Sequence, residues 1–279
     1  MALPRFELKY RVSNATALAV RSYVSGFLEL DRFVTDHASL SYPVDSIYLD
    51  SPDLTTFWST VNAVKCRYKL RVRTYSDHPD APVFFEIKRR INACIVKDRG
   101  AVHRPAVEGL LAGRMPMPDD MASGDRSHLH AVEHFVRLML EIEAAPRARV
   151  RYQREAWVSR DQPGLRLTMD RDVCVTPAFV PPADTHDVHA PARPFGETVV
   201  LEMKFSGRGP AWFRDLEQIA GLQRSSAAKY CDGILTRGVD HFSPSFPQPM
   251  DARRFYQAEA RRDRLAASPS LPVPSAAFA

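Results

Sequence analysis

The segment Lys69-Leu70-Arg71-Val72-Arg73-Thr74-Tyr75 begins with a large basic side chain at every second position. A similar alternation recurs in Glu7–Val12, Phe84–Arg90 and Leu201–Phe205. Successive residues of a β-strand point to opposite faces of a sheet, so each segment has one charged face and one largely apolar face. A solvated face accounts for one such strand. Four of them, carrying Arg and Lys rather than Thr, Ser and Gln, predict charged faces that surround a shared basic lumen.

The remaining elements follow from periodicity and from capping residues. Residues 128–143 carry apolar side chains at helical spacing, and Ser13-Asn14 can cap a helix that starts at Ala15. Further strands are expected over residues 5–12, 45–50, 66–75, 83–90, 93–99, 149–157, 165–176 and 199–205, and helices over 15–30, 128–143, 211–222 and 227–237.

Composition limits the class of protein. The chain has 279 residues, is 45% hydrophobic and 25% charged and has a net charge of +5, which is the balance of a soluble globular protein. No stretch approaches the roughly 20 apolar residues that cross a bilayer, and the N-terminus lacks a signal-peptide core. The four cysteines are widely spaced and indicate neither zinc nor a disulfide framework. We therefore expect a cytoplasmic protein with reduced thiols.

Two regions differ in composition. Residues 1–242 contain every predicted strand and form the expected domain, whereas residues 243–279 are rich in Pro, Ser and Arg. Such a segment buries too little apolar surface to offset its ordering entropy. We expect the tail to be disordered or partly helical, with a basic helix over residues 253–267.

The charged strand faces predict an anionic ligand. Buried charges are costly unless they are paired or solvated, so a lumen with excess cations should hold water and anions. Arg binds phosphate bidentately and Lys binds it as a compact charge, which favours a phosphate chain. The alternative is an open, solvent-facing sheet with cross-strand ion pairs. The inward-facing cations are predicted to be Lys9, Arg11, Lys69, Arg71, Arg73, Lys88, Arg90, Lys97, Arg99, Arg154, Arg166 and Lys204, against the carboxylates of Glu7, Glu86, Asp170 and Glu202.

An ordered set of segments resembles a known family. The set consists of Arg5–Tyr10, Lys69–Arg73, Glu86–Lys88, Arg154 with Arg166, Leu201–Phe205 and Lys229-Tyr230, and it is similar to the VTC domain of the triphosphate tunnel (CYTH-like) superfamily over residues 4–240. The resemblance implies an α+β fold, in which helices brace a closed or nearly closed antiparallel β-barrel with a charged tunnel. It also implies a polyphosphate polymerase, a transferase that moves the γ-phosphoryl group of ATP to a growing polyphosphate chain.

The resemblance also implies roles for individual residues. The catalytic set is Arg71, Arg73, Lys88, Arg154, Arg166 and Lys229, and the substrate-binding set is Lys9, Lys97, Tyr152 and Lys204. The inward strand faces add Lys69 and Arg99 to the substrate-binding set. Glu202 matches the family's metal-binding glutamate. One departure is Ala228, where the family often has a serine before the lysine, so one hydroxyl donor to phosphate is missing.

The chemistry agrees with this assignment. Phosphoryl transfer needs in-line positioning and neutralisation of charge on the phosphate oxygens, which Arg and Lys side chains and a divalent cation supply. Glu202 offers a hard oxygen ligand suited to Mg²⁺ or Mn²⁺. The sequence contains no P-loop and suggests no Ser-His-Asp or Cys-His arrangement.

Three alternatives remain open. Hydrolases and cyclases of the superfamily typically open with E-x-E-x-K, whereas this chain has Arg5-x-Glu7-x-Lys9, which favours a polymerase over a metal-dependent tri- or polyphosphatase. A non-catalytic polyphosphate- or nucleotide-binding module has less need of Glu202. Specific nucleic-acid binding is disfavoured because Tyr10, Tyr68 and Phe85 fall on apolar faces. The expected partners are therefore ATP and polyphosphate.

Overall fold

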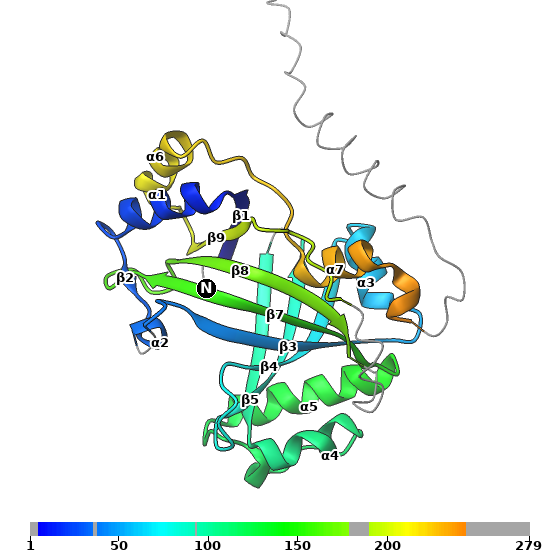
Figure 1. Cartoon of the computed structure of the whole chain (residues 1–279). Coiled ribbons are helices and arrows are strands. Elements are labelled where there is room, and N and C mark those ends of the chain that lie inside the picture. Colours follow the sequence, from blue (N-terminus) through cyan, green and yellow to red (C-terminus); the bar gives the residue numbers. More distant parts are fainter. Residues whose placement is uncertain (1–4, 36–37, 93, 179–189, 244–279) are drawn as a thin grey trace, which may run out of the picture.

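The computed structural model describes residues 5–35, 38–92, 94–178 and 190–243 (Figure 1). Its centre is one antiparallel sheet with strand order β1-β9-β8-β7-β3-β4-β5-β6, and β2 pairs with β7 beside that path. The strands are β1 (Arg5–Val12), β2 (Glu29–Leu30), β3 (Tyr42–Asp50), β4 (Cys66–Thr74), β5 (Val83–Ile91), β6 (Cys94–Val102), β7 (Ala145–Val158), β8 (Arg166–Pro177) and β9 (Val199–Ser206).

Helices pack around this sheet. They are α1 (Asn14–Val24), α2 (Arg32–Thr35), α3 (Thr55–Val61), α4 (Val107–Leu111), α5 (Arg126–Glu141), α6 (Ala211–Ile219) and α7 (Lys229–Arg237), with 3₁₀ turns at Arg104–Ala106, Pro118–Asp120 and Val239–His241. In the described part of the chain, no helix has both the length and the apolar character needed to cross a membrane.

The sheet is strongly curled and nearly closes into a barrel. The path of paired strands ends at β1 and β6, and no ladder joins these two strands within the described residues. They nevertheless lie next to each other. An ion pair of 3.1 Å between Lys88 Nζ on β5 and Glu7 Oε2 on β1 crosses the seam. The predicted antiparallel barrel with a charged lumen and bracing helices is therefore confirmed, with a seam that side chains close in place of backbone hydrogen bonds.

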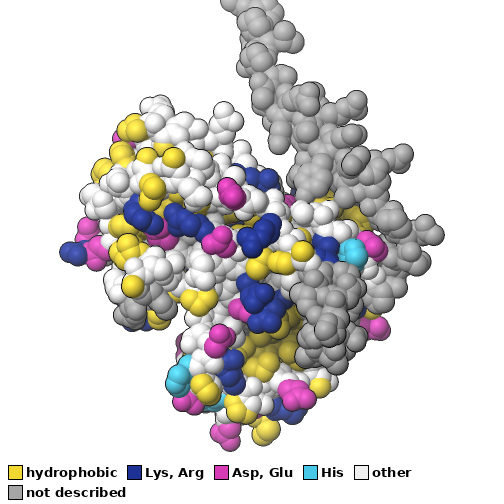
Figure 2. All heavy atoms as spheres, in the orientation of Figure 1, with side chains coloured by type: hydrophobic (Ala, Val, Ile, Leu, Met, Phe, Trp, Pro, Cys, Tyr) yellow, Lys and Arg dark blue, Asp and Glu magenta, His cyan; other side chains and the backbone are white. Residues whose placement is uncertain are grey.

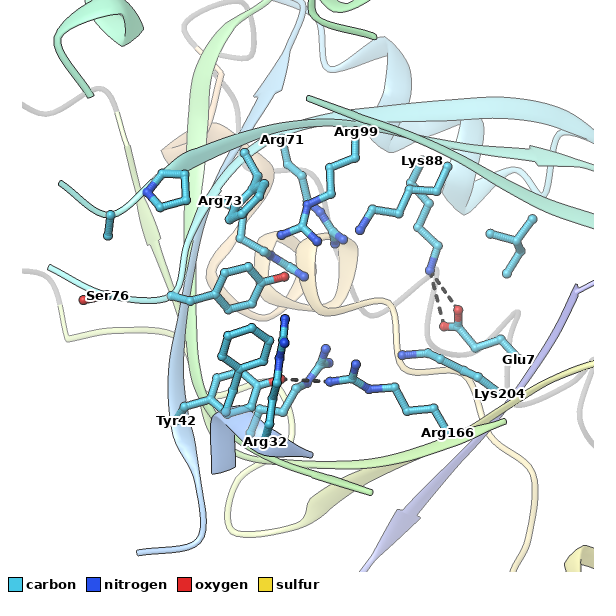
Figure 3. Close-up of a pocket in the computed structure, with 18 residues that line it drawn as sticks. Glu7, Arg32, Tyr42, Arg71, Arg73, Ser76, Lys88, Arg99, Arg166 and Lys204 are labelled. Atoms are coloured by element: carbon cyan, nitrogen blue, oxygen red, sulfur yellow. Dashed lines mark hydrogen bonds and ion pairs between the residues drawn. The ribbon is translucent and has the colours of Figure 1, made fainter. Parts of the chain in front are cut away.

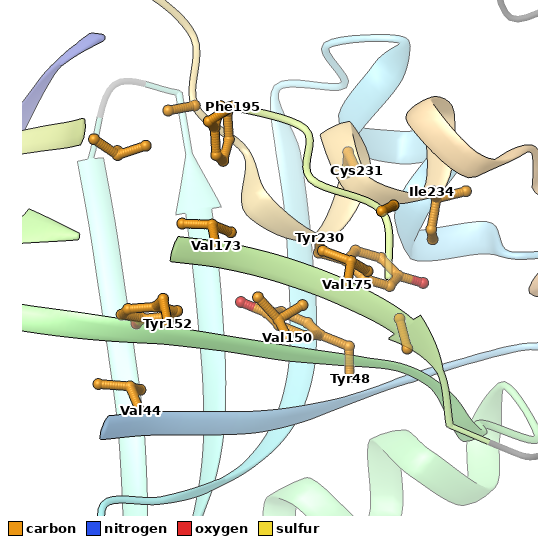
Figure 4. Close-up of a cluster of buried hydrophobic side chains, with 14 of the residues drawn as sticks. Val44, Tyr48, Val150, Tyr152, Val173, Val175, Phe195, Tyr230, Cys231 and Ile234 are labelled. Carbon is orange, nitrogen blue, oxygen red and sulfur yellow. The ribbon is translucent and has the colours of Figure 1, made fainter. Parts of the chain in front are cut away.

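Three apolar clusters attach the helices. One joins α1 and α6 to β1, β8 and β9, and a second joins α4 and α5 to β4, β5 and β6. The third lies between α7 and strands β3, β7 and β8 (Figure 4). In it, Tyr48 stacks on Tyr230 with ring centroids 4.7 Å apart. In the first two clusters, amphipathic strands thus bury their apolar faces under helices and leave the charged faces for the interior. The third cluster includes Tyr48 and Tyr152 from the inward faces of β3 and β7.

Most predicted elements form, and one helix is shorter than expected. Ser13 Oγ accepts a hydrogen bond of 3.0 Å from Thr16 N, so the predicted cap is present. The helix expected over residues 15–30 ends at Val24, because Glu29 and Leu30 pair with Val158 and Trp157 as strand β2. The predicted disordered or helical tail lies outside the described residues.

Candidate functional site

Two adjacent cavities occupy the lumen, with volumes of about 800 Å³ and 560 Å³. We call them the first and the second cavity. Figure 3 shows the first cavity with Arg and Lys side chains converging on its interior from several strands. The residues that line both cavities are Glu7, Arg71, Arg73, Lys88, Ile95, Arg154 and Lys204. Because the shared wall is mostly cationic, the two cavities form neighbouring parts of one basic passage.

The structure brings the predicted site residues together. Lys97, Arg99 and Arg166 line the first cavity, and Lys9, Lys69, Tyr152, Glu202 and Lys229 line the second. The other predicted residues, Arg71, Arg73, Lys88, Arg154 and Lys204, line both. Their shared location is a structural fact, and their catalytic and binding roles stay predictions. Lys and Arg also cross the middle of the exterior face in Figure 2, so basic side chains are not confined to the lumen. Among the lumen cations, Arg73, Arg154 and Lys229 are buried.

Glu86 organises the cations of the first cavity. Its carboxylate is fully buried and lies 2.6 Å from Arg71 Nε, 2.5 Å from Lys97 Nζ and 3.2 Å from Arg99 Nε. Burial alone would raise the pKa of Glu86, but Arg71, Arg73 and Lys97 hold that pKa well below its ordinary value. Glu86 is therefore an anion that keeps three cations in place on the lumen wall.

Glu202 and Asp170 play the same part in the second cavity. Lys229 Nζ lies 2.6 Å from Asp170 Oδ2 and 3.2 Å from Glu202 Oε1, and Lys204 Nζ lies 2.6 Å from Glu202 Oε2. Arg154 makes a bidentate pair with Asp170, at 2.6 and 2.7 Å. These groups are held by charge-assisted bonds, the strong class of hydrogen bond in proteins.

Tyrosines complete the wall. Arg71 Nη1 donates to Tyr48 Oη at 3.1 Å, and Arg154 and Lys229 each lie 5.1 Å from the centroid of the Tyr152 ring. Burial would raise the pKa of Tyr48, yet Arg71, Arg73 and Lys69 lower it to about 8. Tyr152 thus lies between two cations.

Arg166 is held by residues that the sequence analysis missed. Arg166 Nη2 lies 2.9 Å from Asp31 Oδ2 and donates to Tyr42 Oη at 3.0 Å. A second missed contact is Arg73 Nε donating to Ser46 Oγ at 2.8 Å. The available signal was the spacing of Tyr42, Ser46 and Tyr48, which share one face of β3 by period-two alternation.

Arg11 does not belong to either cavity, contrary to the prediction that it faces the lumen. Its Nη2 lies 3.3 Å from Asp232 Oδ2, and its guanidinium lies 4.8 Å from the Phe195 ring centroid. Arg11 shares a strand face with Glu7 and Lys9, but it lies beyond them, where α7 supplies Asp232 as its partner. Arg90, the other outlying cation, lines the second cavity as predicted.

Glu202 is the carboxylate predicted to bind a metal ion. Among the described residues, no group of three or more His, Cys, Asp or Glu side chains is placed to hold a metal ion. Glu202 presents two hard oxygens to the second cavity, and each faces a lysine ammonium group. The residues fit Mg²⁺ or Mn²⁺ only where phosphate oxygens and water supply the other ligands.

A curled antiparallel sheet around a basic lumen, braced by external helices, defines a triphosphate tunnel domain. Residues 4–237 match the VTC domain, and the chain belongs to that family. No curated protein matches the chain.

Solved structures of similar fold share little sequence with this chain. A candidate adenylate cyclase from Bacillus halodurans has 12% identity and a TM-score of 0.43, over 80% of this chain and 94% of that chain. The protein PH1819 from Pyrococcus horikoshii has 12% identity and a TM-score of 0.41, over 83% and 96%. A candidate adenylate cyclase from Vibrio parahaemolyticus has 12% identity and a TM-score of 0.40, over 82% and 96%.

Proposed function

We propose that this protein is an ATP-dependent polyphosphate polymerase that works inside its basic lumen. The observation that carries the proposal is the wall of cations shared by the two cavities. With a nucleoside triphosphate in one cavity and a phosphate chain in the other, their phosphates would meet at the shared wall. The cations of that wall are Arg71, Arg73, Lys88 and Arg154. Family membership supports the same assignment.

The shared wall suits the chemistry of phosphoryl transfer. The reaction needs the attacking and leaving oxygens in line and the charge of the transferred group neutralised. Arg71 and Arg154 are buried and are already fixed by Glu86 and Asp170, so they need little reorganisation when the charge develops. Lys229 and Lys204 extend the cationic wall into the second cavity.

Glu202 is the proposed ligand of Mn²⁺ or Mg²⁺. Such a cation neutralises phosphate oxygens when bound. Glu202 itself is strongly acidic, because Lys204, Lys229 and Lys9 lower its pKa well below the ordinary value in spite of burial. Since lysines face both of its oxygens, we expect metal affinity to rise when a phosphate chain draws those lysines away.

A tri- or polyphosphatase is the second candidate. One observation favours it: Glu7 and Glu202 both approach Lys9 Nζ, at 3.2 and 3.4 Å, so two carboxylates lie close together in the lumen. Paired carboxylates can hold cations that activate water. The products distinguish this candidate from the polymerase.

The test incubates purified protein with ATP and Mn²⁺ and measures acid-stable polymer and free phosphate. The proposal predicts polymer, a loss of roughly a hundredfold in Glu202→Gln, and a similar loss in Arg71→Ala with Arg73→Ala. Arg149→Ala is the matched control, because Arg149 pairs with Asp45 and lines neither cavity. Free phosphate without polymer would establish a hydrolase. Binding without either product would establish a non-catalytic module.

A further inference from the structure

Charged residues give way to aromatic residues at one rim of the lumen. On β4 the inward positions are Lys69, Arg71 and Arg73, and the next position in the same alternation is Tyr75. On β5 the inward series that contains Lys88 and Glu86 ends at Phe84, which pairs with Arg73 in the ladder. On β3 the inward series ends at Tyr42. Three neighbouring strands thus end in aromatic side chains at the same place.

These side chains form a continuous row together with one helical residue. The ring centroids are 6.5 Å apart between Phe33 and Tyr42, 5.9 Å between Tyr42 and Tyr75, and 5.6 Å between Tyr75 and Phe84. We call these four residues the rim row. All four line the first cavity and none lines the second.

The rim row contacts the phosphate-binding cations directly. The guanidinium of Arg99 lies 3.5 Å from the Phe84 ring centroid and 5.4 Å from that of Tyr75, and Arg73 lies 5.9 Å from Tyr75. In Figure 3, Tyr42 and Ser76 lie at one end of the first cavity, and Glu7 and Lys204 lie at the other. The aromatic end is therefore the end away from the second cavity.

A phosphate chain has no planar apolar surface, so it gains little from such a row. Packing of the barrel accounts for Tyr42, which is 5% exposed, and for part of Tyr75, which packs against the same apolar cluster, but not for Phe33 or Phe84. Phe33 is 56% exposed, and Tyr75 and Phe84 are half-buried beside the cavity. Phe84 also lies on the charged face of β5, while its neighbours Val83 and Phe85 fill the core. Aromatic rings beside guanidinium groups are the usual platform for a nucleobase.

We propose that the rim row is a nucleobase subsite, which makes the first cavity the entrance for a nucleoside triphosphate. The base stacks on Tyr75, Phe84 and the Arg99 guanidinium, and the triphosphate extends toward Arg73 and Arg71. The second cavity, which lacks the row, is left for the phosphate chain. This inference rests on the proposed function, because it requires that nucleotide enters the lumen.

The experiment compares ATP with inorganic tripolyphosphate by calorimetric titration of the full chain. Tripolyphosphate has the phosphates but no base, and its greater negative charge favours it electrostatically. A stacked base contributes about tenfold to affinity, whereas the charge difference favours tripolyphosphate in every variant. We therefore expect Phe84→Leu with Tyr75→Leu to lower the ratio of ATP to tripolyphosphate affinity about tenfold.

The control is Phe27→Leu, since Phe27 is also partly exposed but stacks on Trp212 outside the lumen. A ratio of ATP to tripolyphosphate affinity that is the same in wild type and in the double variant would overturn the subsite alone. If neither ligand binds, or if Arg71→Ala with Arg73→Ala does not weaken tripolyphosphate, the proposed function fails and the subsite fails with it.

Discussion

Glu86 shows how single carboxylates make a basic lumen possible. Its carboxylate is completely buried and pairs with Arg71, Lys97 and Arg99. Three cations at such a distance would repel one another without an internal counter-charge. One carboxylate offsets part of that repulsion and leaves a net positive wall for an incoming phosphate. The self-repulsion expected of an empty basic lumen is therefore relieved at defined points.

The first prediction removes this internal counter-charge. Glu86→Gln keeps the shape of the side chain but leaves its three cations without their anion. Breaking such a buried arrangement costs on the order of 3 kcal/mol. We expect a lower Tm for the empty protein and a larger Tm increase with tripolyphosphate than in wild type, measured by thermal melting. Asp80→Asn, in an exposed pair with His78, should change neither value. A variant as stable as wild type would contradict the role given to Glu86.

The second prediction concerns Asp31, which positions Arg166 through a 2.9 Å ion pair. Asp31→Asn frees the guanidinium to sample other orientations. We expect tripolyphosphate affinity to fall about threefold to tenfold, because Arg166 then has to be ordered on binding. Asp45→Asn is the matched control, since it breaks an Arg-Asp pair outside the lumen. Equal losses in both variants would show that Asp31 has no specific link to the site.

At the scale of elements, Asp50 ties two helices to the end of β3. Its carboxylate accepts from the backbone amides of Thr56 and Phe57 on α3, each at 2.9 Å, and from Tyr230 Oη on α7 at 2.8 Å. Tyr230 follows Lys229, so this carboxylate also fixes the start of the helix that carries a predicted catalytic residue. A fully buried acceptor with several donors is hard to replace.

The third prediction follows from that arrangement. Asp50→Asn replaces one acceptor oxygen with an amide donor, which faces donors at the same place. We expect a loss of about 2–3 kcal/mol in the free energy of unfolding, measured with denaturant. Asp53→Asn is the comparison, because Asp53 is solvent-exposed and its partners, which include the Ser51 and Thr55 side chains, are all nearby in the chain. If the two variants lose the same stability, Asp50 does not join the two helices.

The strands were predictable because their alternation is local. In β1 and β9, each residue's face follows from its position, and the ladder pairs Lys9 with Glu202 on the same lumen face. Contacts across the seam were not predictable. The approach of β1 to β6, and with it the pair of Glu7 and Lys88, depends on how the whole sheet curls. One local signal for the end of α1 was Gly26, a poor helix former two residues after Val24. The pairing of β2 with β7 was not predictable, since it is a tertiary contact.

The sequence was also a poor guide to which face of the sheet each aromatic side chain occupies. Phe84 and Phe85 are adjacent and equally apolar, but one lines the lumen and the other lies in the core. Alternation alone assigns Phe84 to the charged face. The interpretation of aromatic residues as core residues is correct for Phe85 but not for Phe84, so the rim row was not predicted.

For the whole molecule, the fourth prediction is that anion binding weakens as pH rises. Burial lowers the pKa of Lys88 to about 8, with Lys9 and Arg71 acting in the same direction against Glu7. Burial also lowers the pKa of Lys97 to about 8, with Arg71 and Arg99 adding to the effect against Glu86. Above that pH the empty lumen loses positive charge, and a bound phosphate chain restores it by proton uptake.

We therefore expect tripolyphosphate affinity to fall at least about tenfold between about pH 7 and pH 9, followed by calorimetry. Lys88→Arg with Lys97→Arg is the control, because arginine keeps its charge over this range. The affinity of that variant should fall less with pH than that of wild type, and the remaining fall belongs to Tyr48 and Tyr75, because in spite of burial the neighbouring arginines lower the pKa of each to about 8. A wild-type affinity that is unchanged or rises over the interval would show that these lysines stay charged in the empty protein.

The central claim is that the barrel lumen, and not the exterior, holds the phosphate chain. A crystal structure with bound tripolyphosphate tests it most directly. We predict phosphate density along the wall shared by the two cavities, within hydrogen-bond distance of Arg71, Arg73 and Arg154. Tripolyphosphate bound only to exterior basic residues, with the lumen free of phosphate density, would contradict the claim.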